Sequence, residues 1–246
     1  MALITDDVGP GVRLVGFNRP ERSNALDEAM VEEIDRVLAD AAKRAPAILI
    51  FHSTTPGTFV AGADISELIE RGADAALRGI NAGLFERIEA HRWPTVAVVD
   101  GPAFGGGCEL ALACDFRVGT PNARFAQPEL NLGILARAGG NWRLTQVVGQ
   151  QLARRMLYTG EIVDAKAAVA VGLVDSLHTS DAALRAAMEL ADTIGRRSWR
   201  ALELTKLSMR VHRTATTTFD IAAQALLFES DDKLTRMRSF LDRKKS

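Results

Sequence analysis

The sequence lacks any apolar run long enough to cross a membrane. Its longest stretch without Lys, Arg, Asp or Glu, residues 45–63, is interrupted by Pro46, His52 and Pro56, whereas a spanning helix needs about 20 consecutive, predominantly apolar residues. The first seven residues carry two acidic and no basic side chains, which is the wrong order for a signal peptide. We therefore expect a protein with no membrane association that works in the cytoplasm.

Cysteine and histidine are also scarce, with two and four residues among 246. Cys108 and Cys114 lie six positions apart in an apolar stretch, so a disulfide framework and a Cys/His metal site are both unsupported. We expect two thiols that fill space in the core. The histidines are scattered through the chain and stand in no nucleophile motif. A hydrolase triad and a metal centre are therefore disfavoured.

The chain as a whole has little excess of either charge, since its formal net charge is −1. This balance argues against nucleic-acid binding, which favours a basic stripe across a domain. The two signs are unevenly spread, because residues 190–246 hold 12 Lys and Arg against 7 Asp and Glu. This basic end is either a solvated helical face or an anion-binding surface, and composition alone leaves both open.

Apolar runs and helical periodicity alternate over the first 180 residues, a pattern that predicts an α/β domain with a parallel sheet. Strands are predicted over residues 12–17, 47–51, 95–99, 116–118 and 172–174. Helices are predicted over residues 26–41, 73–92, 107–113 and 139–158. A Gly9-Pro10-Gly11 turn places the first strand in a hairpin. Strand signals stop after Ser180, so we expect an α/β core over 1–190 and a helical region over 191–246.

Two glycine-bearing turns follow the two most apolar strands, at residues 59–64 and 101–109. Each turn leads into a helix and so presents free backbone N–H groups at the positive end of that helix. Two such ends side by side would form an oxyanion hole, although glycines after a strand are also ordinary turn residues. Neither turn matches GxxxxGK(S/T) or GxGxxG, so a phosphate cradle is disfavoured.

Two glutamates are candidates for acid and base chemistry. Glu109 lies in the first turn of a predicted apolar helix, beside the second glycine turn, where a charge is costly unless it is used or paired. Glu129 follows 20 residues later, far enough for one strand out and one strand back. Two glutamates that face one pocket can divide the acid and base roles, and the alternative for each is an exposed or structurally paired side chain.

These residues belong to an ordered set of motifs that resembles the crotonase superfamily, and within it the enoyl-CoA hydratases. The resemblance covers nearly the whole chain. Its motifs are Asn18-Arg19-Pro20, Asn24-Ala25-Leu26, FVAGADISE at 59–67, GPAFGGGCELALACD at 101–115, Gln127-Pro128-Glu129, Leu132-Gly133, Ala138-Gly139-Gly140, Arg143-Leu144, Val148-Gly149, Thr159-Gly160, 168–174 and 228–245.

The resemblance implies a fold and a reaction. The fold is a crotonase-like spiral of ββα repeats with a helical C-terminal trimerisation region, and the assembly is a homotrimer or homohexamer. The reaction is hydration of a 2-enoyl-CoA in fatty acid metabolism, with acyl-CoA as substrate and with no metal or other cofactor. The oxyanion-hole amides correspond to Ala63 and Gly106. Glu109 and Glu129 would hold and deprotonate the water, and Glu129 would deliver a proton to the α-carbon.

The resemblance also implies contacts to coenzyme A. The residues that correspond to this binding site are Arg22, Ala25, Ala61, Asp64, Ile65, Phe228, Phe240 and Lys244. The last three would lie near the nucleotide end, which would give the basic end of the chain an anionic ligand.

The chain departs from the family in the loop after Glu129. Hydratases usually carry Pro-Gly after the Leu-Gly-x-x step, where the glycine N–H helps hold the catalytic water, but here the loop ends in Ala136-Arg137. The backbone N–H of Arg137 remains at this position. The Arg137 side chain could recognise a carboxylate on the acyl chain, pair with the glutamates and suppress hydration, or extend into solvent. We favour the first, because suppression would leave the glutamate pair without a role.

Two alternatives to a hydratase stay open. One is a double-bond isomerase of the same superfamily, in which Glu129 alone shuttles the proton. The other is a non-catalytic acyl-CoA-binding protein whose water site is filled by Arg137.

Overall fold

A computed structural model of the chain describes residues 2–44, 47–68 and 79–210. The chain forms two compact units, residues 1–191 and 192–246. The first unit holds all the described strands and the candidate site, and the second contains helix α9 (Trp199–Arg210). In the described ranges no helix is both long and apolar enough to span a membrane.

A six-stranded sheet forms the centre of the first unit, in the order β1-β2-β3-β4-β6-β9. Strands β1 and β2 form the predicted antiparallel hairpin, and every later pairing in this sheet is parallel. All five residues of β4 are buried, which explains its unbroken apolar sequence, because parallel strands are covered on both faces. The strands are β1 (Leu3–Gly9), β2 (Val12–Phe17), β3 (Ile48–Ser53), β4 (Thr95–Val99), β6 (Phe116–Gly119) and β9 (Ser176–Leu177).

A second, three-stranded sheet is absent from the prediction. It consists of β5 (Pro102–Phe104), β7 (Arg124–Ala126) and β8 (Val163–Asp164), in that order. Strands of two or three residues are too short to show an alternating pattern. The strand predicted at 172–174 is wrong, because these residues form a turn between α7 (Ala165–Ala170) and β9. Leu173 and Val174 are apolar because they are buried in the core of the unit.

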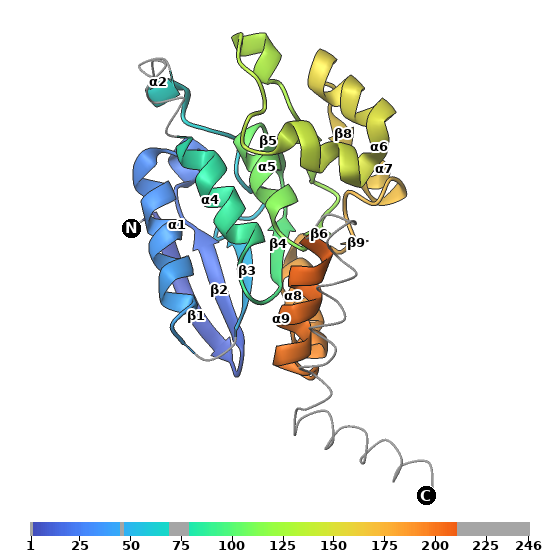
Figure 1. The fold of residues 1–246 in the computed structure, drawn as a ribbon. Coiled ribbons are helices and arrows are strands. Elements are labelled where there is room, and N and C mark those ends of the chain that lie inside the picture. The colour runs from blue at the N-terminus through green and yellow to red at the C-terminus, as the bar shows by residue number, and fades with distance from the viewer. Residues whose placement is uncertain (1, 45–46, 69–78, 211–246) are drawn as a thin grey trace, which may run out of the picture. The chain divides into compact units, whose positions relative to one another are not determined.

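Helices pack against the sheets in the order that the periodicity predicts. Figure 1 shows α1 and α4 side by side, and the two helices are in contact. Helix α1 begins where the Asp27 carboxylate accepts the N–H of Met30 at 2.8 Å, which caps the helix. The helices are α1 (Glu28–Ala41), α2 (Ile65–Leu68), α4 (Ile80–Glu89), α5 (Gly106–Ala113), α6 (Gly140–Thr159), α7 (Ala165–Ala170) and α8 (Ser180–Gly195), with 3-10 turns η1 (Pro20–Arg22) and η2 (Glu129–Leu132). Of the helix predicted at 73–92, residues 73–78 lie outside the described residues.

The start of α5 is pressed against the turn that follows β3. A Cβ on Gly107 would overlap the carbonyl oxygen of Val60, so only glycine permits this approach. Gly105, with φ of 50°, turns the chain from β5 into α5. Cys108, in this helix, and Cys114, at its end, are buried and form no disulfide, as predicted. The close approach brings the two glycine-bearing turns together.

Candidate active site

The candidate site residues predicted from the sequence line one cavity of about 690 Å³. All four predicted catalytic positions line it, as do all the nominated binding residues that the structure describes. These residues are Ala63, Gly106, Glu109, Glu129, Arg22, Ala25, Ala61, Asp64, Ile65 and Arg137. Phe228, Phe240 and Lys244 lie outside the described residues, so their roles stay predictions.

The backbone amides of Ala63 and Gly106 meet on one side of the cavity. The nitrogen of Ala63 lies 3.5 Å from the position that a Cβ on Gly106 would take. Within the described chain no hydrogen bond uses either N–H, and Gly106 is the first residue of α5, where an amide has no partner inside the helix. Two free donors therefore point to the same region, beside the positive end of α5.

Glu109 is held in the first turn of α5 with its carboxylate in the cavity. The side chain is buried, and its Oε1 accepts the N–H of Gly140 at 2.9 Å. Burial raises the pKa of Glu109, while backbone hydrogen bonds from Gly140 and Ala138 and the nearby Arg143 charge act in the opposite direction. Glu109 is therefore fixed by the loop that leads into α6.

Glu129 begins the 3-10 turn η2 across the cavity from α5. Burial raises its pKa to about 7, and the neighbouring charge of Glu109 acts in the same direction. A Cβ on Gly105 would lie 3.1 Å from Oε1 of Glu129, so glycine at this position leaves room for the carboxylate beside the start of α5. A glutamate with a pKa near 7 can donate or accept a proton at neutral pH.

Arg143 supports the loop that holds Glu109. Its guanidinium pairs with Glu89 at 2.6 Å and donates to the carbonyl oxygen of Ala138 at 2.9 Å. The Arg143 side chain is buried and that of Glu89 is partly exposed, so Arg143 links the loop at Ala138 to α4 through one ion pair and one backbone hydrogen bond.

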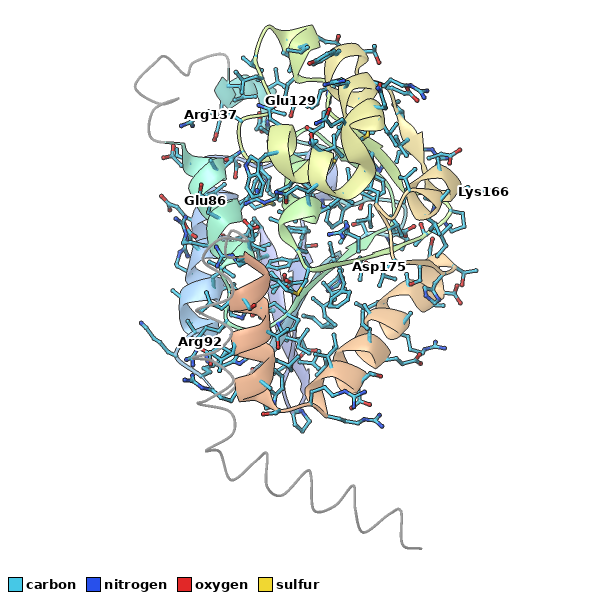
Figure 2. The ribbon with its side chains drawn as sticks, turned by 45° about the vertical axis from the view of Figure 1, so that its right-hand side comes forward. Glu86, Arg92, Glu129, Arg137, Lys166 and Asp175 are labelled. Atoms are coloured by element: carbon cyan, nitrogen blue, oxygen red, sulfur yellow. The ribbon has the colours of Figure 1, made fainter. Side chains whose placement is uncertain are left out.

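Arg137 lines the same cavity but pairs with neither glutamate. It is not among the charges that shift the pKa of Glu109 or Glu129, and its guanidinium lies beside Gly79, with Nη1 2.8 Å from where a Cβ on Gly79 would be. Figure 2 shows the labelled Arg137 and Glu129 at the same end of the first unit. The structure therefore does not show the pairing that would suppress hydration.

The amide of Arg137 is engaged, contrary to expectation. It donates to the carbonyl oxygen of Leu135 at 2.8 Å in a tight turn. The sequence leaves this N–H available to hold a water, but in the structure the carbonyl oxygen of Leu135 occupies it.

Residues 7–246 match the sequence profile of the Enoyl-CoA hydratase/isomerase family. The chain belongs to this family. It is 35% identical over 237 residues to a 2,3-dehydroadipyl-CoA hydratase of Escherichia coli (95% of this chain, 93% of the relative). It is 32% identical over 244 residues to a short-chain-enoyl-CoA hydratase of Clostridium acetobutylicum (95% and 92%). A crystal structure of an enoyl-CoA hydratase from Bacillus anthracis superposes with a TM-score of 0.93 at 27% identity (99% and 97%).

Family membership confirms the predicted superfamily and the crotonase-like α/β fold with its helical C-terminal region. Trimerisation is a further claim about that region, and it stays a prediction. In the parts of the chain that the structure describes, no group of three or more His, Cys, Asp or Glu side chains is placed to hold a metal ion.

Sequence reasoning missed the role of Gln127, which this family member carries two residues before Glu129. The Gln127 side chain is buried, and with its amide nitrogen turned toward the carboxylate it donates to both oxygens of Glu129, at 2.8 and 3.0 Å. The orientation of such an amide follows from its hydrogen bonds. The sequence shows Gln127 only as part of a motif, because nothing local predicts that its side chain turns back to Glu129.

Proposed function

We propose that this chain is an enoyl-CoA hydratase that adds water across the double bond of a 2-enoyl-CoA thioester. The observation that carries the proposal is the meeting, in one cavity, of two buried glutamates with raised pKa values and two unpaired backbone N–H groups. The hydratases among the relatives, named for dehydroadipyl-CoA and short-chain enoyl-CoA substrates, support it.

The amides of Ala63 and Gly106 would bind the thioester carbonyl oxygen. Addition of water at the β-carbon moves the double-bond electrons toward this oxygen, which becomes an enolate oxygen in the transition state. The two N–H groups lie where that charge develops, beside the positive end of α5. Loss of one such donor typically costs about 2.7–4 kcal/mol of transition-state stabilisation.

The two glutamates divide the proton transfers. The Glu109 carboxylate holds the water and takes a proton from it as the new C–O bond forms at the β-carbon. Glu129, which holds a proton for much of the time because its pKa is about 7, delivers that proton to the α-carbon. A proton passing from Glu109 to Glu129 restores the starting state, so no metal or redox cofactor is required.

The substrate's CoA portion would lie along the mouth of the cavity. Arg22 reaches it from η1 and is held by Asp64, with 3.0 Å between Nη1 and Oδ2. Ala25 and Ala61 are small residues that leave space beside this pair. We further propose that the chain works in the cytoplasm in fatty acid metabolism, as a homotrimer or homohexamer built through residues 191–246.

An isomerase is the second candidate function. It is favoured by one observation, the engaged amide of Arg137, because a water held by one donor fewer is easier to lose. Glu129 alone could then move a proton between the α- and γ-carbons. A non-catalytic acyl-CoA-binding protein is less well supported, since Arg137 does not neutralise the glutamates.

Mixing the purified protein with crotonyl-CoA tests the proposal. A hydratase removes the conjugated thioester absorbance, and Glu109→Gln and Glu129→Gln proteins serve as matched controls for contaminating activity. A 3-enoyl-CoA assayed in parallel reports isomerisation through the gain of the same absorbance. Isomerisation of the 3-enoyl-CoA with no hydration of crotonyl-CoA would overturn the hydratase assignment in favour of the isomerase.

A further inference from the structure

Arg137 is the one cation on the described cavity wall that no described residue neutralises. The other cavity-lining cation, Arg22, pairs with Asp64. Arg137 has no ion pair or side-chain hydrogen bond within the described chain. An arginine on a wall of a ligand cavity, facing no counter-charge from the described residues, is suited to a ligand that brings its own negative charge.

The surroundings of Arg137 combine apolar walls with a second positive feature. Leu132, Ile134 and Leu135 line the cavity on the same loop, although a large part of each side chain is exposed. The guanidinium lies beside Gly79, which precedes α4. The start of α4 has neither a side-chain cap nor an acidic residue in its first turn, so it adds positive potential to that of the arginine. Among the described residues, no acidic side chain pairs with the Arg137 guanidinium or caps the start of α4.

The position of Arg137 along the chain relates it to the reacting atoms. It stands three residues before Gly140, whose N–H holds Glu109, and eight residues after Glu129. The backbone of Arg137 therefore belongs to the loop that holds Glu109, whereas its guanidinium lies beside Gly79. An anion bound there would lie in the same cavity as the two glutamates.

We propose that Arg137 recognises a carboxylate at the far end of the acyl chain, so that the substrate class is a short 2-enoyl-CoA with a terminal carboxylate. This rests on the proposed function for the location of the acyl chain. A planar guanidinium can bind a carboxylate by donating two parallel hydrogen bonds to its two oxygens. The phosphates of CoA are a second source of negative charge for the same group, and the experiment below distinguishes the two.

Two substrates of equal length test this proposal: 2-hexenoyl-CoA and the six-carbon 2-enoyl-CoA that ends in a carboxylate. The wild-type protein, Arg137→Gln and Arg137→Lys are compared by kcat/KM. We expect the wild type to favour the carboxylate substrate and Arg137→Gln to lower that preference by about ten- to hundredfold, the range for hydrogen bonds to charged groups. Arg137→Lys should restore part of it through charge alone. Arg36→Gln, an exposed arginine on α1, is the matched control and should keep the wild-type preference.

Binding separates failure of this proposal from failure of the hydratase assignment. Calorimetry with the saturated analogues, hexanoyl-CoA and its terminal carboxylate counterpart, needs no turnover. If the protein hydrates neither substrate but Arg137→Gln selectively weakens the carboxylate analogue, carboxylate recognition stands and the hydratase assignment fails. Equal weakening of both analogues would assign Arg137 to CoA phosphates and overturn the proposal. An unchanged preference in Arg137→Gln would overturn it as well, leaving the arginine as a solvent-facing side chain.

Discussion

The N–H of Gly140 donates to Oε1 of Glu109 at 2.9 Å, which joins the start of α6 to the first turn of α5. This bond fixes the orientation of the Glu109 carboxylate, which lines the cavity. A Cβ on Gly140 would lie 2.7 Å from the side-chain amide group of Gln127, the residue that supports Glu129. Gly140 is therefore linked to both glutamates. Its own N–H holds Glu109, and its Cα lies against the Gln127 side chain that holds Glu129.

Substituting Gly140 should disturb both carboxylates together. In Gly140→Ala the new methyl group would lie too close to Gln127 and to the side chain of Ala136, so one of them must move. We expect kcat for hydration to fall by about tenfold or more, since misplaced catalytic groups lose rate steeply. Steady-state kinetics on crotonyl-CoA measure this, with circular dichroism to establish folding. Unchanged kcat in a folded variant would mean that the loop adapts freely.

The glutamates themselves should each be needed for turnover. We expect Glu109→Gln and Glu129→Gln to lower kcat for hydration by about 10² or more, with acyl-CoA affinity little changed, because a general acid or base typically contributes that much. Steady-state kinetics and calorimetric titration with a saturated acyl-CoA measure the two quantities. Full hydratase activity in Glu109→Gln, with isomerase activity lost in Glu129→Gln, would favour the isomerase.

The pKa of Glu129, about 7, predicts the pH dependence of the rate. If Glu129 gives its proton to the α-carbon, kcat/KM for hydration should fall as the pH rises through about 7, because the acid form is lost. Removing the neighbouring negative charge in Glu109→Gln should lower the pKa of Glu129. A profile that rises through pH 7 instead would make Glu129 the base in the rate-limiting step.

The same raised pKa links folding stability to pH. The folded state binds a proton on Glu129 more tightly than the unfolded chain does, where a glutamate has its ordinary pKa of 4.5. The stabilising effect of that proton is therefore complete below pH 4.5 and is lost as the pH rises through about 7. We expect Glu129→Gln to gain about 2–3 kcal/mol of stability relative to wild type between pH 5 and pH 8. Urea unfolding at the two pH values measures this, and a pH-independent difference would show that Glu129 titrates normally.

Deleting the residues after Ser230 tests the predicted CoA contacts of Phe240 and Lys244. We expect weaker CoA binding and loss of the trimer together, measured by calorimetry and by light scattering. A monodisperse monomer that still binds CoA tightly would contradict both expectations.

The sequence predicts the long elements well because their apolar periods are sustained. The burial of β4 and the amphipathic face of α1 are both visible in the sequence. The two- and three-residue strands β5, β7 and β8 escape prediction, since their pairing depends on neighbours far away in the sequence.

The candidate site is predictable in its residues but not in its contacts. Ordered motifs identify Glu109 and Glu129 as a pair. The hydrogen bonds from Gln127 and Gly140 and the turn that uses the amide of Arg137 arise only when separate loops come together. A local sequence pattern cannot predict contacts between residues that are far apart in the sequence.

The most direct test of the central claim is the product formed from crotonyl-CoA in water enriched in oxygen-18. We expect 3-hydroxybutyryl-CoA that carries the heavy oxygen on its hydroxyl group, formed by the wild type about 10² times faster or more than by Glu129→Gln. Mass spectrometry of the acyl-CoA product measures the increase in mass, which shows that water was added and that its oxygen came from the solvent. A product of unchanged mass with a shifted double bond, or unreacted crotonyl-CoA, would contradict the assignment as a hydratase.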